Sequence, residues 1–400
     1  MRLCLSCFLI LMVPRAAAGN IPGCGPDMDT LPRGEVIDRV VCGRFPDQSY
    51  ALVLPVGYDP DREWPVVFIF EPAARGPLAA RVFLDASRRF GVIVMCSNNS
   101  SNRSLEGSFR AAEAMFDDAF RLFSADTSRI ILSGFSGGAR VASNLALEDP
   151  RVDGVIACGA GMYHNRESHP RFRADFCYYG IMGRRDMNLP DMMMTAERFA
   201  GLNMPSWFQY TGGRHVWPPT EEIEAAVAWT LFMIDSTDAR ARDFFVNFQE
   251  TAIGEMEGRG LILDAAMRLE SLDRLFPERG SGHRLSLIKG NRRYRQQEKQ
   301  RERALAREQN LKEIYLGALD DLPYTTAARP DTVHTFRWWS REIDMLKRWE
   351  KGKQLENSMM ASRVLYLLEV RFSEDIDAYM DTGQHEKALF LRELWRRISP

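Results

Sequence analysis

A serine lies between glycines at the end of an apolar run, in the stretch Gly134-Phe135-Ser136-Gly137-Gly138. The Gly-x-Ser-x-Gly spacing is typical of a nucleophile on a sharp strand-to-helix turn, where the glycines remove side-chain clashes. Residues 129–132 read as a buried strand and residues from 139 onward as a helix, which is the context the motif requires. A glycine-rich turn with an idle serine is the alternative interpretation.

A serine hydroxyl becomes a nucleophile when a base accepts its proton. The chain has six histidines, and His215 is the one directly after the last predicted strand and before the last predicted helix. A structural loop histidine is the alternative interpretation there. The other five lie beyond the α/β region or in a polar excursion whose spacing matches no strong metal-ligand pattern: His283, His334, His385, His164 and His169.

The base needs an acid that fixes its tautomer. The segment after the preceding strand, GRRDMNLPDMM, offers Asp186 and Asp191. Asp186 stands at the carboxyl end of the strand, whereas Asp191 is expected to cap the helix that starts there. The order Ser136, Asp186, His215 is the one shown by hydrolases with this turn. We therefore predict these three residues as nucleophile, acid and base, with no metal and no cofactor.

Strand-like and helix-like runs alternate from residue 50 to about residue 235. Such alternation predicts a mostly parallel sheet with helices on both faces. Active sites in these sheets lie beyond the carboxyl ends of the strands, which is where the three predicted residues fall. The predicted strands are 50–56, 65–70, 91–96, 129–132, 153–158, 176–182 and 206–210, and the predicted helices are 78–90, 108–123, 137–147, 192–202 and 220–234.

The chain resembles the α/β-hydrolase superfamily, and within it the small secreted esterases of the polyhydroxyalkanoate-depolymerase and feruloyl-esterase type. Four segments carry the resemblance: VVFIFEPAARG, GFSGGARVA, GRRDMN and GGRHVWP. The resemblance covers about half the chain and implies an α/β-hydrolase sheet and a two-step acyl transfer on an ester. The excursion at 159–175 is too short for a large lid, and an open site suits extended or polymeric esters.

The oxyanion donors depart from the family pattern. Many relatives have a His-Gly turn after the second predicted strand, whereas this chain has EPAARG at residues 71–76. The proline there has no N–H. We therefore predict Gly137 and Ala73 as the backbone donors, with Ala74 as the alternative to Ala73.

The surroundings of the serine give two further expectations. A carboxylate at Glu71 would repel an oxyanion, so it must turn away, towards Arg75 or Arg140. The substrate pocket is predicted to be walled by aromatic side chains, for which packing alone is the alternative role: Phe135, Tyr163 and Trp217.

The length of the chain is sufficient for two domains, and its overall composition is ordinary. The chain has 400 residues, 26% of them charged, and a net charge of −2, so nothing in the total points to a nucleic-acid partner. Residues 1–19 combine a basic residue, an apolar run and a small-residue end, which predicts a secretory signal peptide and a secreted or periplasmic protein. No other segment is apolar enough to cross a membrane.

Five cysteines remain beyond the predicted signal peptide. Cys24 and Cys42 lie in loop-like sequence, where they could pair in an oxidising compartment. Cys96, Cys158 and Cys177 lie in or beside apolar runs, so we expect them to be buried small apolar side chains.

The second half of the chain is predicted to be all-helical. We place the hydrolase domain at 25–238 and the helical region at 239–400, so that a chain ending at Asp238 would still hydrolyse small esters. A large apolar interface between the helices and the sheet is the alternative that would prevent this. The arginine- and lysine-rich segment 284–312 is expected to be a solvated helix rather than an anion site.

Two stretches of the helical region resemble tetratricopeptide repeats, with other helical hairpins as the alternative. The region would then attach the enzyme to a protein partner. The matching small and apolar positions are Gly260, Ala265, Leu269, Leu272 and Pro277 in one stretch, and Phe372, Tyr379, Gly383, Ala388 and Pro400 in the other.

The sequence thus predicts a secreted serine esterase. Two alternatives stay open. One is a binding protein on a hydrolase fold in which catalysis is lost or incidental, which the carboxylate at Glu71 favours. The other is a serine peptidase with the same three residues.

Overall fold

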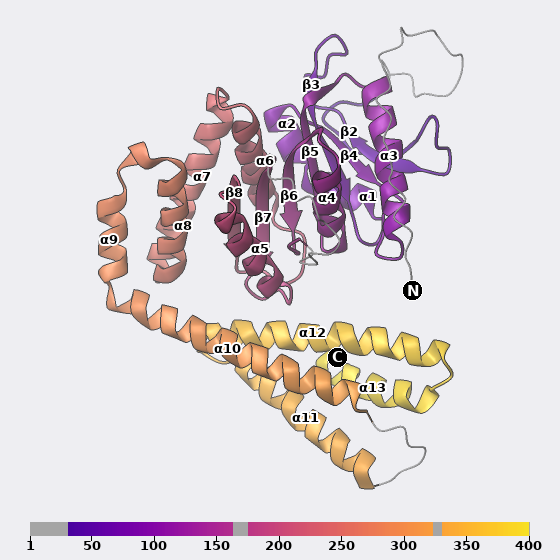
Figure 1. Cartoon of the computed structure of the whole chain (residues 1–400), viewed down its shortest axis with the longest axis vertical. Helices are drawn as coiled ribbons and strands as arrows, with labels where there is room; N and C mark the ends of the chain where they lie inside the picture. Colours follow the sequence, from indigo (N-terminus) through magenta and orange to yellow (C-terminus); the bar gives the residue numbers. More distant parts are fainter. Residues whose placement is uncertain (1–30, 163–174, 323–329, 400) are drawn as a thin grey trace.

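The structure is a computed structural model that describes residues 31–162, 175–322 and 330–399. A sheet with flanking helices forms the first half of the chain, and helices alone form the second (Figure 1). Several predictions fall outside the described residues and stay predictions: those on residues 1–19, Cys24, Tyr163, His164, His169 and Pro400.

The sheet has eight strands in the order β1-β2-β4-β3-β5-β6-β7-β8. The β1–β2 and β2–β4 pairs are antiparallel, and all other pairs are parallel. The strands are β1 Ile37–Val41, β2 Ser49–Val53, β3 Trp64–Phe70, β4 Ile93–Ser97, β5 Ala125–Phe135, β6 Val152–Cys158, β7 Cys177–Gly183 and β8 Ser206–Thr211. Sequence patterning missed β1, because this edge strand is half exposed and carries two charged residues.

Helices cover both faces of the sheet. Neighbouring strand residues point to opposite faces, and so Phe68 and Val67 belong to two different apolar cores. The first core contains α3 Leu105–Leu122, α4 Gly137–Glu148 and α5 Leu189–Gly201, and the second contains α1 Gly76–Val82, α2 Leu84–Phe90 and α6 Thr220–Ile234. The predicted architecture is confirmed: a doubly wound, mostly parallel α/β sheet, followed by an all-helical region.

The helical region divides into two parts. The helices α7 Ala239–Gly258, α8 Ile262–Leu275 and α9 Gly282–Gly290 extend the core on the α6 face of the sheet, with the short turn η1 Pro277–Arg279 between the last two. The remaining helices have an apolar core of their own. They are α10 Arg292–Asp320, α11 Pro330–Glu350, α12 Leu355–Asp381 and α13 His385–Ile398, and they lie together below the sheet in Figure 1.

Each stretch that resembles a tetratricopeptide repeat lies at a pair of successive helices. Gly260 lies in the turn between α7 and α8 with φ +72°, and Gly383 lies between α12 and α13 with φ +73°. A positive φ favours glycine at such turns. Helix pairs of this kind occur in many folds, so the repeat family stays a prediction.

Some side chains of the basic segment 284–312 have acidic partners within the chain. Arg284 pairs with Glu250 and Glu257 at 3.0 and 2.9 Å, and Lys312 pairs with Glu308 at 2.8 Å. These ion pairs use part of the positive charge internally, which favours the solvated-helix interpretation over an anion site.

The cysteines of the sheet are buried, as predicted for Cys96, Cys158 and Cys177. Burial raises the pKa of the Cys158 thiol far above its usual value, so the thiol stays neutral. Within the described ranges, no helix is both long and apolar enough to cross a bilayer.

Glu222, in the first turn of α6, gives a prediction about pH. Its Oε2 is buried and has no hydrogen-bond partner among the described residues. Burial raises its pKa from 4.5 to about 7, although Arg268 acts in the opposite direction. Because the folded pKa lies above the unfolded value, the fold favours the protonated carboxyl, and stability is lost as the pH rises from about 4.5 through about 7.

Glu222→Gln is therefore expected to stabilise the protein at pH 8 by about 1–3 kcal/mol and to leave it unchanged near pH 4.5. Urea unfolding of both proteins at the two pH values measures this difference. An equal difference at both pH values would contradict the assignment, since a neutral packing effect does not depend on pH.

Candidate active site

Ser136 lies on the turn between β5 and α4 with φ +53° and ψ −119°. A positive φ in a residue other than glycine is strained and persists only where the surroundings hold it. Here the Ser136 N–H donates to the Cys158 carbonyl of the neighbouring strand β6 at 2.8 Å. The turn thus lifts the serine side chain beyond the end of the sheet.

The glycines of the motif are needed because three elements meet at this turn. A Cβ on Gly134 would lie 2.3 Å from the carbonyl carbon of Gly138. A Cβ on Gly138 would lie 1.9 Å from the carbonyl oxygen of Phe70, at the end of β3. Such distances leave no room for any side chain, and so the spacing of the motif follows from backbone packing.

The structure brings together the three side chains predicted as nucleophile, base and acid. Ser136 Oγ lies 2.9 Å from His215 Nε2, and His215 Nδ1 lies 2.8 Å from Asp186 Oδ2. The Asp186 side chain is 1% exposed, and its other oxygen accepts the Asn188 N–H at 2.9 Å. Both carboxylate oxygens are thereby fixed, and the imidazole is held with its Nε2 facing the serine.

Asp186 and His215 lie on two loops that are fastened to each other. Asp186 follows β7, and His215 follows β8. The Arg184 N–H donates to the Thr211 carbonyl at 2.8 Å, and the Arg185 N–H donates to the Gly213 carbonyl at 3.0 Å. These backbone bonds set the position of Asp186 relative to His215.

Asp191 does not cap the helix as predicted. The helix α5 begins at Leu189 with Asn188 as its N-cap residue, so Asp191 lies inside the first turn. Its Oδ2 accepts a hydrogen bond from Arg140 Nη2 at 2.9 Å. The helix starts earlier than expected because Asp186 already binds the Asn188 N–H, which turns the chain at that point.

Two of the three predicted pocket aromatics lie beside the His215 ring or next to each other there. The Phe135 ring is 4.6 Å from the His215 ring and 5.4 Å from the Trp217 ring, centre to centre. Phe135 is only 6% exposed, and Trp217 also packs against Phe83. These contacts show packing around the imidazole, while contact with a substrate stays a prediction.

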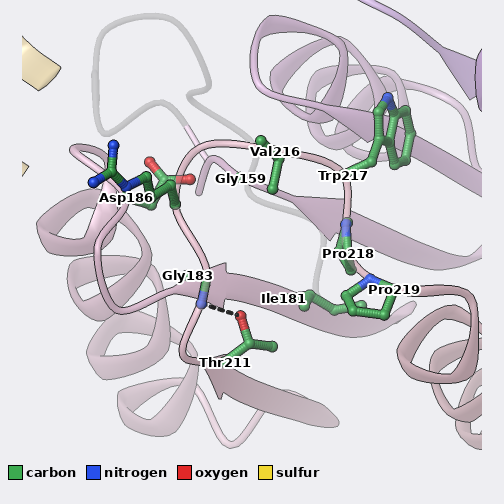
Figure 2. A pocket seen from close by; sticks show the side chains of 11 residues that line it. Gly159, Ile181, Gly183, Asp186, Thr211, Val216, Trp217, Pro218 and Pro219 are labelled. Carbon is green, nitrogen blue, oxygen red and sulfur yellow. Dashed lines mark hydrogen bonds between the residues drawn. The ribbon is translucent and has the colours of Figure 1, made fainter.

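A small cavity lies next to the loops that carry Asp186 and His215 (Figure 2). Its lining includes Asp186, Gly159 and Trp217. The cavity measures about 30 Å³, which is room for roughly one water molecule and not for an ester. Across the part of the chain that the structure describes, no group of three or more His, Cys, Asp or Glu side chains could hold a metal ion.

Glu71 is fully buried and turns towards Arg75, one of the two arginines predicted for it. Its Oε1 accepts a hydrogen bond from Arg75 Nε at 3.0 Å. Its Oε2 accepts the Ala73 N–H at 2.7 Å. The predicted second oxyanion donor is therefore already bonded to a carboxylate, and a substrate oxygen would have to compete for it.

Sequence patterning missed Asn102, whose side-chain amide lies against Gly137. A Cβ on Gly137 would lie only 1.8 Å from Asn102 Oδ1. The Asn102 N–H also donates to the Pro72 carbonyl at 2.9 Å, which ties it to the segment that carries Ala73. The available signal was its place in the polar run that follows β4.

The helical region also reaches the site, which the sequence did not predict. The Tyr366 ring of α12 lies 5.6 Å from the His215 ring, centre to centre. Burial raises the pKa of Tyr366, and the negative charges of Glu369 and Asp186 add to this effect. The hydroxyl therefore stays protonated beside the predicted acid.

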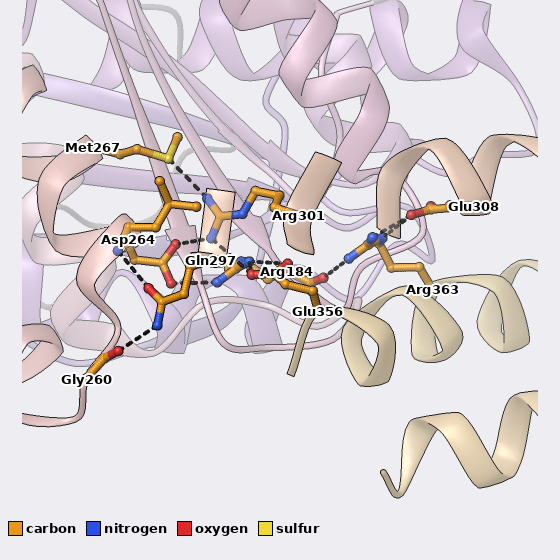
Figure 3. A network of polar contacts seen from close by, with 10 residues as sticks. Arg184, Gly260, Asp264, Met267, Gln297, Arg301, Glu308, Glu356 and Arg363 are labelled. Carbon is orange, nitrogen blue, oxygen red and sulfur yellow. Dashed lines mark hydrogen bonds and ion pairs between the residues drawn. The ribbon is translucent and has the colours of Figure 1, made fainter. Parts of the chain in front are cut away.

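The loop that carries Asp186 is bound to the helices by ion pairs (Figure 3). Arg184 Nη1 donates to Asp264 of α8 at 2.5 Å, and its Nη2 donates to Glu356 of α12 at 2.6 Å. Arg363 of α12 donates to the Arg184 carbonyl at 2.5 Å. The helical region is thus in direct contact with the loop that carries Asp186.

No protein-family model matches the chain, and no curated protein matches it. Solved structures show a likeness to about half of it. The fluorophosphonate-binding serine hydrolase FphF of Staphylococcus aureus is 12% identical, with 47% of this chain and 92% of that chain covered and a TM-score of 0.40. A ferulic acid esterase is 14% identical, with 50% and 97% covered and a TM-score of 0.39. The esterase LipW of Mycobacterium marinum is 15% identical, with 51% and 82% covered and a TM-score of 0.40.

Proposed function

We propose that the protein is a serine hydrolase that cleaves carboxylic esters through an acyl-enzyme. One observation carries the proposal: the hydrogen-bonded chain from Ser136 through His215 to Asp186, built on a strained turn at the end of β5. Strain of this kind is held at a cost in stability and is typical of functional sites. Nucleophile, base and orienting acid stand within hydrogen-bond reach of one another, as this chemistry requires.

The mechanism follows from the two distances to the imidazole. His215 Nε2 takes the proton from Ser136 Oγ as that oxygen attacks the ester carbonyl carbon. Asp186 holds the proton on Nδ1 and stabilises the imidazolium that forms. His215 then gives its Nε2 proton to the departing alcohol. A water molecule repeats the attack on the acyl group with the same base, which releases the acid and restores Ser136.

The negative oxygen of the tetrahedral intermediate needs hydrogen-bond donors. Gly137 is the first residue of α4, so its N–H has no acceptor within the helix, and the positive end of the helix dipole favours an anion there. Ala73 remains a donor only if its N–H leaves Glu71. We propose the Asn102 side-chain amide as the second donor: Oδ1 is its atom nearest to Gly137, but Nδ2, the atom that donates, would lie only 3.3 Å from a Cβ at that position.

Asn102→Ala is expected to lower kcat about 10²-fold with little change in KM, because the lost donor acts on charge that develops in the transition state. Asn102→Asp should lower kcat at least as far, since a carboxylate of nearly the same shape repels the oxyanion. Steady-state kinetics of both variants test this. An unchanged kcat in Asn102→Asp would instead support the Ala73 N–H as the second oxyanion donor.

A fluorophosphonate probe tests the proposed function, because only an activated serine is labelled rapidly. We expect rapid labelling of the purified full chain at Ser136, mapped by mass spectrometry. A panel of esters and matched amides then separates the esterase from a peptidase. An unlabelled, inactive protein would support a hydrolase-fold binding protein instead.

The two aspartates near β7 are expected to differ sharply in effect. Asp186→Asn should lower kcat about 10⁴-fold, because an amide at this position favours the wrong imidazole tautomer. Asp191→Asn removes the negative charge that faces Arg140 and should cost about 1 kcal/mol of stability or less. Ester kinetics and thermal unfolding of both variants measure the two effects. The reverse ranking in kcat would move the acid to Asp191.

We further propose an extended or polymeric ester as substrate and a secreted or periplasmic location. The short excursion at 159–175 and the apolar run within residues 1–19 support these two points. Fractionation of the producing cells, with activity assayed in each fraction, tests the location.

A further inference from the structure

The helix α12 is fixed across the acid–base loops by buried charges. The Arg184 and Glu356 side chains are 8% and 10% exposed, and those of Arg363 and Glu308 are 3% and 2% exposed. Removing one partner of such a pair leaves an unpaired buried charge, which is strongly unfavourable. The position of α12 over the loops is therefore well defined.

The same face of α12 carries a tyrosine to the base. Glu356, Arg363 and Tyr366 follow one another at spacings of seven and three residues, which places them along one side of a helix. The first two bind the acid loop, and Tyr366 lies beside the His215 ring. Tyr366 is partly exposed, whereas Phe135, the other aromatic ring next to His215, is buried. Tyr366 is therefore the more accessible of these two rings.

The chemistry decides which half of an ester comes near this ring. The departing alcohol oxygen must receive its proton from His215 Nε2. The group bonded to that oxygen therefore lies next to the imidazole, while the acyl group stays on Ser136. A ring beside the imidazole borders the alcohol half of the substrate.

We propose that Tyr366 is a specificity-determining residue that selects esters with a flat, ring-bearing alcohol by stacking against it. The inference rests on the proposed function and deepens it, because it names the class of alcohol. The helical region then supplies a wall of the active site in place of a separate attachment module. Offset or edge-to-face aromatic pairs are favourable beyond their buried area, which corresponds to about 3- to 10-fold in kcat/KM.

Two pairs of synthetic esters separate the alcohol half from the acyl half. Benzyl acetate and cyclohexylmethyl acetate have alcohols of similar reactivity that differ in the flatness of the ring. Methyl phenylacetate and methyl cyclohexylacetate carry the same rings in the acyl half. The ratio of kcat/KM within each pair is compared between the wild-type full chain and the variants Tyr366→Ala, Tyr366→Leu and Tyr366→Phe.

In Tyr366→Ala and Tyr366→Leu we expect the benzyl-to-cyclohexylmethyl ratio to fall about 3- to 10-fold and the acyl ratio to stay within twofold. Tyr366→Phe keeps a flat ring and should preserve both ratios. Met380→Ala, an exposed position on the same helix, controls for substitutions on α12. Equal changes in both ratios, or no change in either, would overturn the inference.

Fluorophosphonate labelling of each variant distinguishes failure of the Tyr366 inference from failure of the proposed function. A wild-type protein that is not labelled at Ser136 would refute the esterase itself. A labelled protein whose alcohol ratio does not depend on residue 366 would refute only the role of Tyr366.

Discussion

Replacing Ser136 with alanine is expected to lower the turnover of ester hydrolysis about 10⁶-fold while the protein stays folded. The reason is that Ser136 Oγ is the atom that His215 Nε2 contacts, at 2.9 Å, and alanine offers no nucleophile in its place. Ester kinetics, circular dichroism and thermal unfolding of the purified variant measure both halves of this expectation. The fluorophosphonate probe should no longer label the protein.

Ser143→Ala, in the helix α4 that follows the turn, is a matched control. The Ser143 hydroxyl donates to the Ala139 carbonyl at 2.8 Å and lies in the core, away from the turn. This variant should keep its labelling and lose at most about 1 kcal/mol of stability. If Ser136→Ala kept a tenth of the wild-type activity, Ser136 would not be the nucleophile.

Much of the sheet could be predicted from the sequence, because its strands are buried on both faces. The strand β3 reads as one apolar run, and all seven of its residues are buried. Polar residues that follow such runs stand out, which is how Ser136, Asp186 and His215 were found. The edge strand β1 has no such run and was missed.

The contacts between the two halves of the chain could not be predicted. Arg184 and Glu356 are 172 residues apart, and nothing in their local patterns marks them as partners. The same holds for Tyr366 and His215. Charged residues on a helix are usually solvated. The sequence pattern therefore predicts solvent exposure for the charged residues that form buried ion pairs in the helical region.

The bond between Glu71 and the Ala73 N–H was missed for a different reason. The sequence showed that a carboxylate must turn away from the serine, and an arginine offered an obvious partner. A carboxylate has two oxygens, however, and the second one binds the nearest backbone N–H groups, of Ala73 and Arg75. Local loop geometry of this kind depends on dihedral angles that residue types do not specify.

The predicted boundary between the sheet domain and the helical region, at Asp238, is the second place where a large effect is expected. From the sequence, a chain ending at Asp238 would remain active unless the helices share a large apolar interface with the sheet. The structure shows such an interface on the α6 face. Phe245 of α7 packs edge-on against Trp207 of β8 at 4.9 Å between ring centres. Gln249 of α7 donates to the buried Gln209 side chain at 3.0 Å.

We therefore expect a chain ending at Asp238 to aggregate, with no active soluble product. Each large apolar side chain left exposed loses about 1.5–3 kcal/mol, and a few such losses equal the typical stability of a domain, about 5–15 kcal/mol. Arg184 would also lose Asp264 and Glu356 together, next to the predicted acid. Soluble yield and fluorophosphonate labelling measure the result.

A chain ending at Asn291 separates loss of the apolar core on the α6 face from loss of the contacts that α12 makes with the Asp186 loop. It keeps α7, α8 and α9, and with them the core on the α6 face and the partner Asp264, but it lacks α12 with Glu356 and Tyr366. We expect this chain to be soluble and to label more slowly than the full chain, because one side of the acid loop is no longer held. Full activity of the chain ending at Asp238 would instead show that the helices are a separate module. In that case the ion pairs of Arg184 would be a docking contact that the chemistry does not need.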